Sequence, residues 1–238
     1  MSAHFLLAHS PLAISKALGL SVAPEPRPRI EIDRGDRVPV LEVRYSQTRK
    51  STEAQWGVPV PWESPFFEHM SYVRSEDIGR KQHLGLLQDF CTCIIPSSAI
   101  IATHNPKPNT TPRCVCRADR DIMQYAGVMC SWVSPRGMVT HGCLILTQAA
   151  NRYLLPDNNR MPFILDDNEA DRWLEYDLLK SENIYHDFTP FSSRGLESVL
   201  IESDPLLIFQ QACKGFDALP SRAILMETES SLEMALSR

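Results

Sequence analysis

The middle of the chain reads CTCIIPSSAIIATHNPKPNTTPRCVCRADRDIMQYAGVMCSWVSPRGMVTHGCLILT over residues 91–147. Short apolar runs alternate there with clusters of Pro, Asn, Asp and Gly, which is the pattern of strands joined by turns. This stretch predicts a mainly antiparallel β core. With one earlier segment of alternating polarity, the predicted strands are Val38–Tyr45, Ile94–Ile95, Ile100–Thr103, Cys114–Arg117, Gln124–Met129 and Cys143–Thr147.

Helices are predicted on both sides of this β core. Near the N-terminus, Ser10-Pro11 is followed by LAISKAL and then Gly19, which predicts a helix with a capping residue, a first-position Pro and a terminating Gly. Asp167–Leu178 combines an acidic start with apolar residues at helical spacing. A third helix is predicted to open at Asp204-Pro205 and to end near Gly215.

Length and composition indicate a folded protein with one core. Of the 238 residues, 43% are apolar and 22% are charged, as in soluble globular proteins. A chain of this length buries roughly 70% of its unfolded surface, so a core forms without disulfides or metal ions. We expect one domain over residues 1–225, followed by a polar tail over residues 226–238.

The sequence predicts a cytoplasmic protein without membrane contact. No stretch approaches the ~18 to 20 consecutive apolar residues that a membrane span needs. The apolar run at the N-terminus has no Lys or Arg before it and is broken by Pro11, unlike a secretory signal.

Charge is distributed unevenly along the chain. Residues 166–238 carry 15 acidic and 6 basic residues, which leaves 14 acidic (29 − 15) and 18 basic (24 − 6) residues in the first 165. The basic part permits a nucleic-acid face without requiring one. The acidic part leaves open a second class of function, a non-catalytic module that binds a protein partner through residues 166–238.

Seven cysteines, an odd number in mostly apolar surroundings, favour reduced and buried thiols. Two C-x-C pairs suggest four zinc ligands, but one-residue spacing on a strand only places both thiols on one face. No P-loop, GxGxxG, HExxH or G-x-S-x-G string occurs. We therefore expect no metal and no cofactor. The cysteines are Cys91, Cys93, Cys114, Cys116, Cys130, Cys143 and Cys213.

Several strings, taken in order, resemble the SRAP family, the SOS response-associated peptidases or abasic-site processing proteins. The resemblance covers roughly residues 1–175, and it implies an α+β fold with a mixed, barrel-like β core surrounded by helices, in a monomer. The strings are SAHF from Ser2, WGVP from Trp56, YVRSED from Tyr72, CIIP from Cys93, AGV from Ala126, TQAAN from Thr147, NRMPFIL from Asn159 and DRWL from Asp171.

The resemblance also implies a chemistry that this chain has lost. In the family, Met1 is removed and the amine and thiol of a Cys at position 2 close on the aldehyde of an abasic site in single-stranded DNA. An Asn, a Glu and a His assist. Here Ser2, Tyr72, Ala102 and Asn158 stand at those four positions. Ala102 cannot transfer a proton, a function typically worth ~10²–10⁴ in rate, so we expect a pseudoenzyme.

The positions that cradle DNA in the family are better retained. Arg74, Thr147 and Arg160 match, Trp62 is suited to stack on a base, and His4 replaces an Arg. Guanidinium groups bind phosphate and aromatic rings stack on unpaired bases, so the resemblance implies that binding of single-stranded DNA with abasic sites survives.

Two alternatives remain open at these positions. In the first, the Ser2 amine forms a reversible imine with the abasic aldehyde and the protein is an active lyase. In the second, the residues are structural: Arg74 pairs with Glu76, and Trp62 belongs to the core. Proteolysis is not expected, because only Met1 precedes Ser2 and ordinary methionine removal would expose it.

Overall fold

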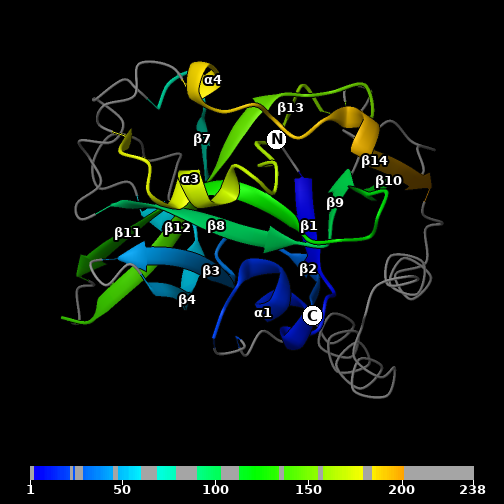
Figure 1. The fold of residues 1–238 in the computed structure, drawn as a ribbon. Helices are drawn as coiled ribbons and strands as arrows, with labels where there is room; N and C mark the ends of the chain where they lie inside the picture. Colours follow the sequence, from blue (N-terminus) through cyan, green and yellow to red (C-terminus); the bar gives the residue numbers. More distant parts are fainter. Residues whose placement is uncertain are drawn as a thin grey trace, which may run out of the picture.

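The computed structural model builds the chain around two β-sheets with short helices at their periphery (Figure 1). The fold is therefore α+β with a barrel-like β core, as expected. A separate two-stranded pairing joins β5 (Val58–Pro59) and β6 (His69–Met70). The described residues are 3–21, 24, 29–44, 48–59, 69–78, 90–102, 113–133, 137–154, 158–178 and 184–200.

The first sheet closes on itself. Its strands follow the order β11-β8-β3-β4-β12, and β12 pairs back onto β11. These pairings are antiparallel except between β12 and β4, which meet in parallel at Gly142 and Gln55. Two short strands, β7 and β13, pair with the end of β12 outside this closed set of five strands. The bounds are β3 (Arg37–Arg44), β4 (Thr48–Trp56), β7 (Tyr72–Arg74), β8 (Cys91–Ser97), β11 (Met123–Val133), β12 (Val139–Ala149) and β13 (Arg160–Pro162).

The second sheet is antiparallel and begins at the N-terminal end of the chain. Strand β8 leads through Ser98 directly into β9, so one continuous segment takes part in both sheets. The Ser98 hydroxyl oxygen accepts from the backbone N–H of Ala8 (2.8 Å) and bonds Nδ1 of His9 (2.6 Å). The strand order is β14 (Leu196–Leu200), β10 (Arg113–Arg117), β9 (Ala99–Ala102), β1 (Ala3–Leu7) and β2 (Arg29–Ile32).

A row of aromatic rings connects the interiors of the two sheets. Phe5 of β1 packs against Tyr125 and Trp56, with ring centres 5.8 Å and 5.0 Å apart. Trp56 in turn meets the ring of Tyr72 edge-on at 5.3 Å. Edge-to-face contacts of this kind add to the hydrophobic gain of burying large rings. The row links β11, β1, β4 and β7 in one continuous core.

The six described cysteines are free thiols, as predicted, and Cys213 lies outside the described residues. Cys93 and Cys143 are fully buried, and burial raises the pKa of both thiols. The two C-x-C pairs lie on β8 and β10, strands of different sheets.

The predicted N-terminal helix is confirmed as α1 (Pro11–Leu18). The Ser10 side chain accepts from the backbone N–H of Ala13 at 3.2 Å. Gly19 ends the helix in the left-handed conformation (φ 62°), where its N–H reaches the carbonyl of Lys16. Both caps follow from local sequence alone.

The second predicted helix is shorter than expected. Instead of Asp167–Leu178, α3 covers Ala170–Leu174. The Thr92 hydroxyl on β8 donates to the carbonyl of Leu174 (3.1 Å), which in a longer helix would accept from residue 178. Two short elements follow, α4 (Ile184–Asp187) and η2 (Ser193–Gly195).

The third predicted helix and the polar tail over residues 226–238 lie outside the described residues. Within the ranges that the structure describes, no helix has the length and hydropathy to cross a bilayer.

Substituting Gly127 by Ala tests how tightly the barrel is packed. A Cβ atom there would lie 2.9 Å from the Cys93 Sγ atom and 3.1 Å from the carbonyl oxygen of Leu144. Such overpacking typically costs ~1–3 kcal/mol, so Gly127→Ala should lower the free energy of unfolding by that amount in a urea titration. The loss of stability caused by Gly127→Ala should be smaller when Cys93 is also replaced by Ala, because that change removes the nearby sulfur atom. A single variant as stable as the unmodified protein would contradict this packing.

Candidate functional site

Thr147, near the end of β12, is hydrogen-bonded to two other segments, one that contains β7 and one that begins at β13. We call this group of hydrogen bonds the Thr147 node. Its carbonyl oxygen accepts from the backbone N–H and the hydroxyl of Ser75, both at 2.9 Å, and from the Arg160 guanidinium. The Thr147 hydroxyl donates to the carbonyl of Val73 (3.3 Å). Because Thr147 is only 3% exposed, these bonds satisfy polar atoms that water does not reach.

Arg160 and Glu76 form a bidentate ion pair beside this node. The two guanidinium nitrogens lie 2.7 Å and 2.8 Å from the two carboxylate oxygens. Hydrogen bonding from Arg160 holds the pKa of Glu76 below its ordinary value, against the opposing effect of burial. The structure therefore brings Thr147 and Arg160 together, with Arg160 bound to a carboxylate and a carbonyl of its own chain.

Arg74 lies across from Thr147 in the parallel pairing of β7 with β12. Its side chain is exposed. The alternative in which Arg74 pairs with Glu76 is wrong, because Glu76 pairs with Arg160. Within the described part of the chain, the Arg74 guanidinium has no ion pair and no hydrogen bond, which leaves its charge directed to solvent.

Tyr72 is half-buried and packs against the protein core. One side of its ring meets Trp56, and the guanidinium carbon of Arg34 lies 5.2 Å from the ring centre. Burial raises the pKa of the Tyr72 phenol even though Arg34 opposes this effect through charge and a hydrogen bond. The phenol therefore stays protonated at neutral pH.

Ala102 lies in the second sheet beside the start of the chain. It is directly opposite Ala3 on β1 and opposite Arg113 on β10. Ser2 immediately precedes the paired Ala3 but is itself outside the described residues, as is Trp62. The side chains of His4 and Ala102 are also outside the description.

Asn158 lies on the loop between β12 and β13, where its backbone N–H donates to the carbonyl of Leu154 at 2.7 Å. Its side-chain Nδ2 is buried without a hydrogen-bond acceptor among the described residues. An amide does not titrate near neutral pH, so Asn158 cannot supply the proton that a His would.

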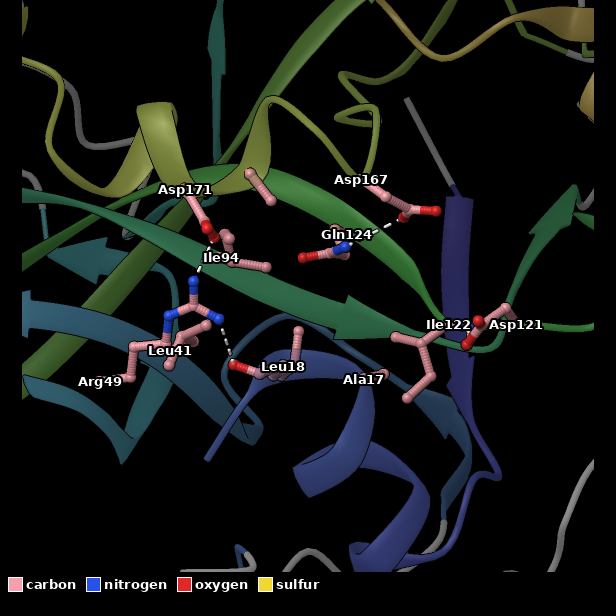
Figure 2. A pocket seen from close by; sticks show the side chains of 11 residues that line it. Ala17, Leu18, Leu41, Arg49, Ile94, Asp121, Ile122, Gln124, Asp167 and Asp171 are labelled. Carbon is pink, nitrogen blue, oxygen red and sulfur yellow. Dashed lines mark hydrogen bonds and ion pairs between the residues drawn. The ribbon is translucent and has the colours of Figure 1, made fainter. Parts of the chain in front are cut away.

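A separate hollow of about 350 Å³ opens between α1, α3 and the barrel strands (Figure 2). Arg49 spans its mouth, donating to the carbonyl of Leu18 (3.0 Å) and pairing with Asp171. Elsewhere along its lining, the amide of Gln124 donates to Asp167 at 3.1 Å. None of the predicted site residues that the structure describes lines this hollow.

Comparison with known proteins decides the family. The sequence profile of the family "SOS response associated peptidase (SRAP)" matches residues 1–204. The chain belongs to this family. Curated SRAP relatives include the "Abasic site processing protein YoqW" of Bacillus subtilis, 23% identical over 152 residues, which are 63% of this chain and 68% of YoqW. A second, the "Abasic site processing protein YoaM" of the same bacterium, is 22% identical over 152 residues, 63% of this chain and 67% of YoaM.

Solved structures share the SRAP fold described above. A crystal structure of a Bordetella bronchiseptica protein superposes with a TM-score of 0.67 at 19% identity, covering 84% of this chain and 99% of that one. A Bacteroides thetaiotaomicron protein gives a TM-score of 0.64 at 19% identity, covering 87% of this chain and 98% of its own.

Sequence reasoning missed two features of this SRAP site. It did not pair Glu76 with Arg160, residues 84 positions apart. It also gave no role to Arg113, whose guanidinium donates to the carbonyl of Tyr153 at 2.7 Å. Neither contact has a local sequence signal, although the register of two adjacent strands would have placed Arg113 beside Ala102.

The Glu76 carboxylate makes the stability of this site depend on pH. Its pKa is lowered in the folded protein, so the pair with Arg160 stabilises the fold fully above the ordinary carboxyl pKa, and this stabilisation is lost as pH falls through the lowered pKa. Glu76 is 42% exposed, and water screens the pair, so Glu76→Gln should cost about 1 kcal/mol or less at pH 7. In urea titrations between pH 7 and pH 3, the difference from the unmodified protein should shrink towards zero. A difference that is constant with pH would contradict the assignment.

Proposed function

We propose that this SRAP chain binds single-stranded DNA at abasic sites and has lost the cross-linking reaction. The family match and the names of the two Bacillus relatives support a role in abasic DNA. The observation that carries the loss of chemistry is position 102. There the strand beside the start of the chain has an alanine, which has no proton to transfer.

The other reactive positions support the same conclusion. The Ser2 hydroxyl holds its proton far more tightly than a thiol does, and the oxazolidine it would form opens readily in water. The Tyr72 phenol is packed in the core with a raised pKa. Asn158 carries an amide in place of an imidazole. General acid–base catalysis is therefore missing at each of these positions.

The proposed binding surface uses the residues that remain. Arg74 carries an exposed guanidinium, and the Thr147–Arg160–Glu76 node holds the neighbouring strands in place. Trp62 and His4 complete the proposed interface as a stacking ring and a polar contact. Binding of this kind depends on backbone charge and base stacking, and it does not require the lost chemistry.

Incubation with a single-stranded oligonucleotide that carries one abasic site tests the loss of chemistry. The protein freed of Met1 should give no shifted band on a denaturing gel, because no thiol is present to form a stable ring. A Ser2→Cys variant run beside it shows whether the nucleophile alone is missing, and borohydride treatment traps any imine. A stable band from the unmodified protein would overturn the proposal, and a band seen only with borohydride would favour the Ser2 amine as a lyase.

Arg74 offers a direct test of DNA binding. Fluorescence anisotropy with a labelled 20-nucleotide oligothymidine that carries one abasic site measures Kd across a series of KCl concentrations. Each phosphate contact to a single strand contributes ~0.7 to the slope of log K against log salt, so Arg74→Gln should reduce the slope by about that amount. Arg194→Gln is the matched control. Arg194 is also exposed, and it lies just before β14, next to the end of the β10–β14 ladder where Arg117 pairs with Leu196. An unmodified protein that does not bind the oligonucleotide would favour the acidic protein-interaction module.

A further inference from the structure

Arg113, the first residue of β10, lies next to Ala102 in the second sheet. The register puts Ala3, Ala102 and Arg113 in one row across β1, β9 and β10. Directly opposed residues of neighbouring strands occupy one row across a sheet. In this row, Ala102 stands where the family resemblance places a Glu. Arg113, a cation, stands next to it on the neighbouring strand β10.

The Arg113 guanidinium reaches from this row to a tight turn on the other sheet. It donates to the carbonyl oxygen of Tyr153 at 2.7 Å. The turn is held by the Asn151 side-chain oxygen, which accepts from the backbone N–H groups of Tyr153 (3.0 Å) and Leu154 (3.3 Å). Arg113 and Asn151 thus fix the backbone of Tyr153 from two sides.

A second guanidinium belongs to the same turn. Arg152 is exposed, and its guanidinium carbon lies 4.9 Å from the centre of the Tyr153 ring. One of its nitrogens donates to the Tyr153 hydroxyl at 3.1 Å. A guanidinium has five N–H donors, so this bond leaves donors directed to solvent. We name Arg113, Arg152 and Tyr153 the arginine turn.

The arginine turn is continuous with the Thr147 node. Its residues Arg152 and Tyr153 lie on the loop that joins β12 to β13, and the backbone N–H of Ala150 donates to the carbonyl of Asn159 at the base of this loop (3.1 Å). Arg160 follows immediately as the first residue of β13. One short loop therefore connects the row of Ala102, the position of Asn158 and the Arg160–Glu76 pair.

We propose that the arginine turn is a second contact for single-stranded DNA, extending the interface of Arg74 towards the second sheet. This inference rests on the proposed function. Arg152 binds a backbone phosphate, the Tyr153 ring stacks on an unpaired base, and Arg113 is a positioning residue that holds the turn. The chemistry fits a polyanion with exposed bases, because guanidinium binds phosphate and an aromatic ring accepts any base on its face.

The anisotropy assay with the oligothymidine that carries one abasic site separates the contribution of Arg152 from that of Tyr153. Arg152→Gln should weaken binding and reduce the salt slope by about 0.7, as one lost phosphate contact does. Tyr153→Leu should weaken binding about 5-fold or more while leaving the salt slope unchanged, because stacking does not release counterions. Tyr153→Phe keeps the ring and should bind like the unmodified protein.

Controls distinguish this inference from the proposed function. Arg194→Gln is the matched arginine control, and thermal melts confirm that each variant is folded. If the unmodified protein binds and Arg74→Gln lowers the slope, but Arg152→Gln behaves as Arg194→Gln does, the arginine turn is overturned and the proposed function stands. If the unmodified protein does not bind the oligonucleotide, both are overturned.

Discussion

The barrel closes because β12 is paired along both of its edges. One edge meets β11 and then β13, while the other meets β4 and then β7. A strand paired along both edges has few backbone N–H and C=O groups left to bond with water. The carbonyl of Thr147 instead accepts hydrogen bonds from Ser75 and Arg160. The closure of the barrel and the placement of the Arg160 side chain are therefore one constraint. The proposed binding surface is built on the same hydrogen bonds that complete the core.

Under the proposed function, the changes at Ser2, Tyr72, Ala102 and Asn158 have a common physical direction. A thiol, a carboxyl and an imidazole move protons near neutral pH, whereas a hydroxyl, a methyl group and an amide do not. The tyrosine at the remaining position has joined the aromatic row through Trp56, where its hydroxyl meets Arg34. Positive charge is meanwhile present at Arg74, Arg113 and Arg152. We infer a surface suited to holding an anion in place of one suited to transferring a proton.

Sequence reasoning succeeded where the signal was local. The caps of α1 at Ser10 and Gly19, and the strands of the middle segment, follow from neighbouring residues, and the fold class followed from these together with the family resemblance. It failed where a distant contact decides the outcome. The end of α3 depends on Thr92, 82 positions before Leu174, and the partner of Glu76 is 84 positions away. Periodicity and spacing carry no information on such contacts, because they arise only when the sheets assemble.

The thiols of Cys93 and Cys143 are fully buried, so their chemical modification can report how often the barrel opens. The thiolate is the reactive form, and burial disfavours it at both positions. An alkylating reagent therefore reaches these sulfurs only when the strands separate, as solvent deuterium reaches a protected amide. The rate of modification in the native protein then measures how often the barrel opens, and a bound ligand that bridges the two sheets slows it.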